Sequence, residues 1–295
     1  MNIGEKIKRL RNEKMMTQAE LSGTVITRNM LSSIENGTAL PSLATLKHIA
    51  AKLNIPAGYL LADGEDEEIY LKLEEISNIK HAYVSENYKI CRDMCLNTSF
   101  EGDDEINLIL AECSLALGIE KFNDGFLRKA SSYFDEAIEI SSKTIYNTEH
   151  ISAISAVYFR YMRKISATLS SNLIDESDTQ IFSALSDAFS CYAVAFEAIE
   201  DGNAELAEHF ISNIDNDLPY VLHIRARIDI LEGRYDEAYE KLYLILINPY
   251  KIQEPIMYFV FCDLEICCKE RKDFKGAYEY SNDKLEILQK MLTDN

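Results

Sequence analysis

The chain has 295 residues, 47% of them hydrophobic, and a formal net charge of −19 at pH 7. This length is too great for one small domain, and this hydrophobic content favours an ordinary folded core, so we expect at least two folded domains. The longest apolar run, from Ile256 to Cys262, is far too short to cross a bilayer, which argues against a membrane protein.

The charge is divided unevenly along the chain. Residues 1–64 hold eight Lys and Arg against five Asp and Glu, a net +3, and the remainder holds 22 against 44, a net −22. A basic segment can meet phosphate, whereas an acidic segment is repelled from it. The segregation therefore favours a nucleic-acid-binding head on a separate acidic body.

The first predicted helix spans about residues 3–14, with Ile7 and Leu10 facing inward. Lys6, Arg9 and Arg11 of this helix are expected on the surface, where plain solvation and phosphate contact are the two alternatives. We predict phosphate contact for Arg9 and Arg11, because the pattern that follows them is that of a DNA-binding motif.

That pattern begins with a capping box, in which the Thr17 hydroxyl accepts from the Glu20 amide and the Glu20 carboxylate reaches back. The box predicts a short helix that ends at Gly23. Thr27 then caps a third helix, which Gly37 ends with a left-handed residue. Two short helices separated by a tight turn have the layout of a helix-turn-helix.

A fourth helix is expected after Pro41 and Ser42, and a last turn over residues 59–61 completes the head. The segments TQAEL, ITRNMLSSIENG and PSLATL together resemble the XRE-type helix-turn-helix family, the phage-repressor and Cro class. The resemblance implies a five-helix DNA-binding domain, which we assign to residues 1–64. The turn before Thr27 is one residue shorter than is usual in the family.

Residue types and the resemblance together predict the residues that contact an operator in double-stranded DNA. Arg28 and Asn29 begin the third helix. An arginine can form bidentate hydrogen bonds with guanine, and an asparagine can do so with adenine. The resemblance implies a backbone or base contact for Gln18 and a phosphate contact for Asn36, although Asn36 also fits a purely capping role. The full predicted set is Arg9, Arg11, Gln18, Thr27, Arg28, Asn29, Ser32, Ser33 and Asn36.

Residues 63–68, DGEDEE, mark the boundary of the head, either as an exposed hinge or as the acidic start of a helix. We expect a short linker that runs into a helix from about Glu67. Beyond it the patterns are helical throughout. A large residue followed three positions later by a small one recurs, with the small residues at 91, 137, 207, 238 and 277 and a degenerate copy expected near 172.

These copies recur with a period in the mid-thirties of residues. A segment with this period, about residues 68–290, resembles divergent tetratricopeptide repeats. The resemblance implies an all-α protein in which stacked helix pairs form an arch with a concave groove. We therefore predict a repeat domain, residues 68–295, that serves ligand binding and dimerisation.

The sequence contains no recognisable catalytic or metal-binding pattern. It lacks G-x-x-x-x-G-K-[ST], G-x-S-x-G and H-E-x-x-H, and its five histidines are scattered. We expect no enzyme activity, no cofactor and no metal. The seven cysteines include no C-x-x-C pair, and we interpret them as reduced, packed thiols in a cytoplasmic protein, with a redox-sensing thiol as the alternative.

Candidate ligand contacts lie on the predicted inner helices of the repeats. Most aromatic residues at helical spacing belong to a core, but paired Arg and Tyr in an acidic body could grip a peptide carboxylate. The candidates are Arg160, Arg163, Tyr192, His223, Arg227 and Tyr258.

A helix-turn-helix head on a repeat body resembles the peptide-responsive quorum-sensing regulators of the Rgg and PlcR type. The resemblance implies a cytoplasmic homodimer whose repeats bind a short signalling peptide and thereby change its binding to an operator. The alternative is an interaction protein, whose repeats dock a protein partner or only dimerise while DNA serves as an anchor.

Overall fold

The computed structural model describes residues 2–171, 173, 187–212, 214–215, 218–248 and 252–293. The chain forms two compact units, Met1–Asn78 and Ile79–Asn295, which we call the head and the body. The described residues form helices and connecting turns, with no strand among them, as expected for an all-α protein. The repeat copy expected near residue 172 lies outside the described residues.

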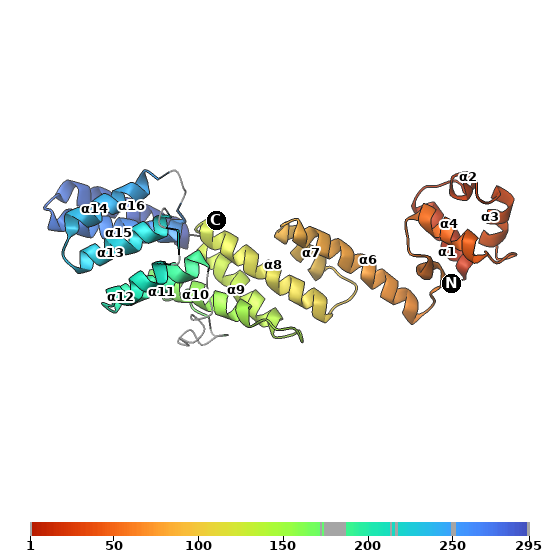
Figure 1. Ribbon diagram of the computed structural model, residues 1–295, viewed down its shortest axis with the longest axis horizontal. Helices are drawn as coiled ribbons and strands as arrows, with labels where there is room; N and C mark the ends of the chain where they lie inside the picture. The colour runs from red at the N-terminus through yellow and green to blue at the C-terminus, as the bar shows by residue number, and fades with distance from the viewer. Residues whose placement is uncertain are drawn as a thin grey trace. The chain divides into compact units, whose positions relative to one another are not determined.

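Five short helices make up most of the head (Figure 1). Their buried faces enclose one core, to which Leu21, Leu31 and Ile49 contribute fully buried side chains. The helices are α1 (Ile3–Glu13), α2 (Gln18–Ser22), α3 (Arg28–Glu35), α4 (Leu43–Leu53) and α5 (Ala57–Leu61).

The predicted helix starts and stops of the head are confirmed. The Thr17 hydroxyl accepts from the Glu20 amide at 3.2 Å, and the Glu20 carboxylate accepts from the Thr17 amide at 2.7 Å. This backbone hydrogen bond lowers the pKa of Glu20. The Thr27 hydroxyl accepts from the Met30 amide at 3.1 Å and so caps α3, and Gly37 ends that helix with a φ of +73°.

The head continues into α6 (Glu65–Val84), so the acidic residues 65–68 begin a helix and are not an open hinge. Two contacts hold the first turns of α6 to the other helices of the head. The Glu67 carboxylate lies 2.9 Å from Nζ of Lys6, and the Tyr70 ring packs edge-on against Tyr59, with centroids 6.0 Å apart. The compact head therefore runs to Asn78, beyond the predicted domain limit at residue 64.

The body contains helix pairs that lie side by side (Figure 1). Short turns join the two members of each pair, as in helical repeats. Its helices after α6 are α7 (Tyr88–Leu96), α8 (Asp104–Asn123), α9 (Leu127–Ser141), α10 (Glu149–Ile165), α11 (Ala188–Glu200), α12 (Ala204–Ile211), α13 (Pro219–Leu231), α14 (Tyr235–Leu246), α15 (Glu254–Glu270) and α16 (Phe274–Leu292).

The second helix of each of five pairs follows the same turn. A residue with positive φ stands two positions before the start of α7, α9, α12, α14 and α16. The small residue five positions after that turn is buried in every pair, which confirms the predicted small positions in four of them. The five turn residues are Glu86, Gly125, Gly202, Gly233 and Lys272, and the five small residues are Cys91, Ala130, Ala207, Ala238 and Ala277.

The repeat copy predicted at Phe134 and Ala137 is displaced from this common position. Because α9 begins at Leu127, the residue equivalent to the other small positions is Ala130. Gly125 provides the turn, with a φ of +81° that a residue with a side chain rarely adopts. Ala137 is also buried, but it lies two helical turns further along α9.

A ladder of aromatic and polar side chains joins successive first helices of the body. Tyr158 stacks on Phe189 with ring centroids 4.4 Å apart, and Phe189 meets Tyr220 at 6.5 Å. These residues follow one another at intervals of 31, so they occupy equivalent positions in α10, α11 and α13. The repetition of side chains shows that the body is built from stacked repeats.

Candidate functional site

The exposed side of α3 carries most of the residues predicted to contact DNA. Arg28 and Asn29 are exposed in its first turn, directly after the exposed cap Thr27. Arg28 makes no ion pair with another described residue. Two more predicted residues, Ser32 and Ser33, are half-buried, and the Ser33 hydroxyl donates to the Asn29 carbonyl at 3.1 Å. Asn36 is exposed at the end of the helix.

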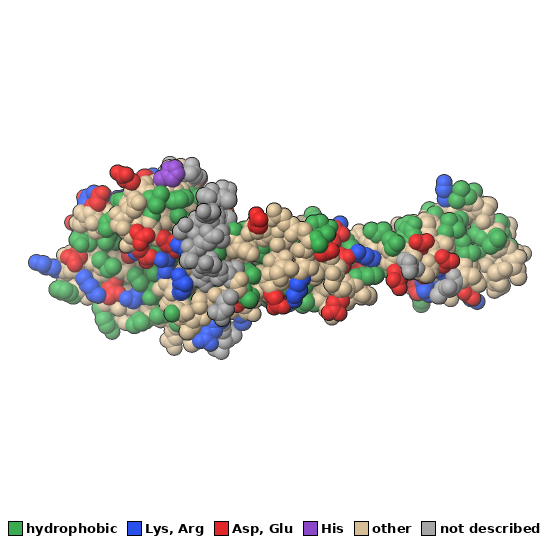
Figure 2. Space-filling view, turned by 90° about the horizontal axis from the view of Figure 1, so that it is seen from below, with side chains coloured by type: hydrophobic (Ala, Val, Ile, Leu, Met, Phe, Trp, Pro, Cys, Tyr) green, Lys and Arg blue, Asp and Glu red, His purple; other side chains and the backbone are tan. Residues whose placement is uncertain are grey.

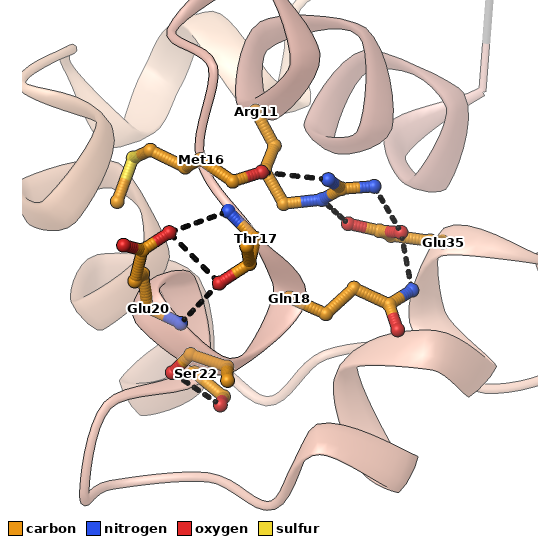
Figure 3. A network of polar contacts seen from close by, with 8 residues as sticks. Arg11, Met16, Thr17, Gln18, Glu20, Ser22 and Glu35 are labelled. Carbon is orange, nitrogen blue, oxygen red and sulfur yellow. Dashed lines mark hydrogen bonds and ion pairs between the residues drawn. The ribbon is translucent and has the colours of Figure 1, made fainter.

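The opposite side of α3 is fixed by a buried carboxylate, that of Glu35 (Figure 3). Its side chain is only 1% exposed. Arg11 from α1 donates to it through Nε at 2.7 Å and through Nη2 at 3.2 Å. Gln18 from α2 donates to the same carboxylate at 2.8 Å, and Arg11 also donates to the Met16 carbonyl at 2.8 Å. One acidic group thus holds three helices together.

This network changes the role of Arg11, whose side chain is only 12% exposed. Its two donors to Glu35 form a bidentate pair, the strong form of a charge-assisted hydrogen bond. Arg11 therefore stabilises the head and is not available for the predicted phosphate contact. The Gln18 amide likewise donates one of its two N–H groups to Glu35, so a contact of Gln18 with DNA would have to use the other N–H or the side-chain oxygen.

Arg9 and Lys6 are also engaged within the head. Arg9 donates to the Tyr59 hydroxyl at 3.0 Å and lies 3.4 Å from Glu67. Lys6 is fully buried and donates to the Ala62 carbonyl as well as pairing with Glu67, so the expected surface position of Lys6 is wrong. The hydrogen bond from Lys6 lowers the pKa of Glu67. These two cations connect α1 to α6, and the phosphate contact of Arg9, whose side chain is 37% exposed, stays a prediction.

Besides Arg28, four lysines contribute basic charge to the surface of the head. Within the described chain these lysines make no ion pair, and all are exposed. No pattern in the sequence distinguishes them, because exposed lysines carry no spacing signal. They are Lys8, Lys14, Lys47 and Lys52.

Two of the six candidate ligand contacts in the body are fully buried, namely Tyr192 and His223. The Asp263 carboxylate can only accept, so Nε2 of His223 donates to it at 2.9 Å. Burial lowers the pKa of His223, so the ring is neutral and its Nδ1 accepts from the Tyr192 hydroxyl at 2.9 Å. The hydroxyl oxygens of Tyr161 and Tyr192 are hydrogen-bonded to each other at 3.1 Å. Tyr192 and His223 therefore serve the core in this structure, and their role as ligand contacts stays a prediction.

The remaining candidates lie nearer the surface of the body. Arg160 donates to Glu197 through Nε at 3.1 Å, and Lys164 lies 3.8 Å from the same carboxylate. Arg227 lies 3.3 Å from Asp263, and its guanidinium stacks over the Phe196 ring at 3.7 Å.

One guanidinium nitrogen of Arg227, Nη1, is buried without a hydrogen-bond partner in the described structure. Arg163 is exposed, and Tyr258 is half-buried against Phe259. Figure 2 shows that acidic and basic side chains are interspersed over the body, as these pairs require.

The cysteines are all free, and six of the seven are buried. Burial raises the pKa of Cys95 to about 12 and that of Cys262 to about 11, which disfavours the reactive thiolate. No group of three or more His, Cys, Asp or Glu side chains suited to a metal ion occurs in the described part of the chain. Among the described helices, none is both long and apolar enough to cross a membrane.

Comparison with known proteins identifies the head. Residues 7–60 match the family model for the helix-turn-helix, which confirms the motif predicted from the capping box and the third helix. The matched residues include α2, the turn and α3. No curated protein matches the chain.

Several solved structures resemble the whole chain weakly. They include PlcR of Bacillus thuringiensis in complex with the peptide PapR7 and DNA, at 16% identity over 99% of both chains with a TM-score of 0.27. ComR from S. thermophilus, in complex with DNA and its signalling peptide ComS, has 15% identity over 97% of this chain and 99% of that chain, with a TM-score of 0.28. The SHP pheromone receptor Rgg2 of Streptococcus dysgalactiae has 12% identity, with coverage of 97% and 99% and a TM-score of 0.22.

The structural role of Arg11 predicts the effect of removing it. Arg11→Met leaves the buried Glu35 without its main partner, which should destabilise the head by about 3–5 kcal/mol. The double variant Arg11→Met/Glu35→Leu should recover most of this loss, because no unpaired charge remains. Amide hydrogen exchange of α1–α3 measures the change separately from the body.

Lys8→Met is the matched control, since Lys8 is an exposed cation on the same helix with no ion pair to a described residue. It should change the stability by no more than about 0.5 kcal/mol. If the Arg11→Met head is as stable as the wild type but binds every DNA sequence more weakly, Arg11 contacts phosphate and its structural role is contradicted.

Proposed function

We propose that the protein is a sequence-specific DNA-binding transcriptional regulator, without enzyme activity, that inserts α3 into the major groove. The observation that carries this proposal is the division of α3 into two sides within a matched helix-turn-helix. Leu31, Ile34 and Glu35 face inward and are buried, whereas Arg28 and Asn29 are exposed at the start of the helix. In such motifs the first residues of the second helix contact base edges.

The distribution of charge supports the same orientation. Residues 1–64 of the head carry a net +3 and the rest of the chain a net −22, so DNA attracts only this first part of the head. One head contacts too little DNA for firm specificity, and we propose that two copies bind a pseudo-palindrome as a homodimer. A regulator of this kind would act in the cytoplasm of a bacterial cell.

Removing Arg28 tests the assignment of α3. Arg28→Ala should weaken binding to the preferred sequence by about 1–3 kcal/mol and relax the preference at one base position, because a bidentate contact with guanine is lost. Titrations of the full chain with the preferred duplex and with single-base variants measure both effects.

Lys8→Ala is the control for the loss of one exposed charge from the head. It should reduce the affinity for all duplexes equally, with a change of at most about 1 in the salt slope. If Arg28→Ala also lowers all affinities equally and keeps the base preference, α3 does not read the sequence through this residue.

The body supports a second part of the proposal, control of DNA binding by a short peptide. Arg160, Arg163 and Lys164 lie within two turns of α10, and Arg227 reaches the Phe196 ring, which Lys164 also approaches at 5.9 Å. A ligand carboxylate could compete with Glu197 for these cations. To act as a switch, the peptide must favour one arrangement of the body over another.

A peptide library tests this control. We expect some short synthetic peptides with free carboxyl termini to change the operator affinity of the full chain by about tenfold, a coupling of about 1.4 kcal/mol. The same peptides with amidated termini should act more weakly, because the carboxylate is lost. Arg163→Gln should reduce the response and leave DNA binding without peptide unchanged.

Arg225→Gln is the matched control, because Arg225 is a half-exposed cation on α13 that pairs with Glu208 at 3.2 Å. It should keep the full response. If no peptide alters operator affinity, or if both Arg variants lose the response equally, the body instead docks a protein partner or serves dimerisation alone.

A further inference from the structure

The turn between α2 and α3 sets the position of the DNA-reading helix. After α2 ends at Ser22, Gly23 adopts a φ of +56° and a ψ of −137°, and Ile26 returns the chain to the core. Only residues 23–27 connect the two helices, so few residues determine the shape of the turn. Whatever holds Ser22 and Gly23 in place also determines where α3 begins.

A side chain from α4 performs this role. Nε2 of His48 lies 3.0 Å from the Ser22 carbonyl oxygen, across 26 residues of sequence. A carbonyl oxygen only accepts, so His48 donates this hydrogen bond. The Ile26 amide also reaches the Ser22 carbonyl, but at 3.4 Å. Ser22 is buried, so its carbonyl oxygen must find its hydrogen-bond donors within the protein. His48 provides the shorter of the two hydrogen bonds that this oxygen accepts.

The contact between α4 and the turn is close and extends to the next residue. A β-carbon on Gly23 would lie 3.6 Å from the His48 ring and 3.5 Å from Cε of Lys52, one helical turn further along α4. The ring and the lysine stem therefore line the space beside Gly23, with room for one β-carbon between them and the glycine. The hydrogen bond from His48 is the contact by which α4 holds the turn.

The geometry points to His48 as a positioning residue for DNA recognition, acting through the α2–α3 turn and not through direct contact with a base. This inference rests on the proposed function. The hydrogen bond holds the end of α2 and thereby the start of α3, where Arg28 and Asn29 are exposed. Without it the exposed residues of α3 would be presented over a range of angles, and discrimination between sequences would fall before general affinity does.

The test measures specificity, non-specific affinity and stability for a set of full-chain variants. A preferred duplex is first selected from random DNA with the wild-type protein, and the affinity ratio between this duplex and a scrambled one is then determined. His48→Leu, which removes the donor, should reduce this ratio about tenfold and leave the scrambled duplex bound as before. His48→Gln, which retains a donor, should restore most of the ratio.

Two further variants separate positioning from other effects. Lys47→Leu alters the exposed neighbour of His48 in the same helix and should keep the ratio. His48→Met, which has a flexible apolar side chain without a donor, gives the same information if His48→Leu does not fold at the assay temperature. The slope of affinity against salt should be equal in the wild type and in the His48 variants, since a lost phosphate contact would lower it by about 1.

The outcomes distinguish this inference from the function on which it rests. A wild-type chain without any sequence preference would overturn the proposed function. A wild-type preference that persists in folded His48→Leu or His48→Met, or that fails to return in His48→Gln, would overturn only the role of His48. A reduced salt slope would make His48 a DNA contact and would also contradict positioning.

Discussion

The head depends on one buried carboxylate. The Glu35 carboxylate on α3 accepts hydrogen bonds from Arg11 on α1 and from Gln18 on α2, and its side chain is almost completely shielded from water. A charge buried in this way is stable only when it is fully paired, so the network restricts how the three helices can be arranged. In the proposed function, this network orients α3 from its buried side, and the hydrogen bond of His48 holds the turn before it.

The local signals in the head were readable from the sequence, but the partners of its charged residues were not. Capping residues such as Thr17 and Thr27 act within one helical turn, so their spacing alone identifies them. Arg11 and Lys6 look like surface cations on an amphipathic helix, and only tertiary packing brings them to Glu35 and Glu67. The amphipathic pattern of the helix therefore predicts a surface position for both residues, although both stabilise the head.

The body shows the same division between local and distant information. The small residues of the repeats are visible in the sequence, but the register of α9 is not, because Leu127–Ala130 and Phe134–Ala137 both match the repeated spacing. Gly125, two residues before that helix, was the available signal. The 31-residue interval from Tyr161 to Tyr192 to His223 could also have identified an internal ladder. Its chemistry depends on Asp263, which the interval does not reveal.

The central claim is that a pair of fixed α3 helices reads a DNA sequence. Selection of bound duplexes from a random pool by the full-length wild-type chain, followed by sequencing, tests this most directly. The account predicts an enriched pseudo-palindrome with two half-sites about one helical turn apart, or a multiple of that distance. A pool that remains random after repeated selection, while the protein stays folded and binds DNA only in proportion to its charge, would contradict it.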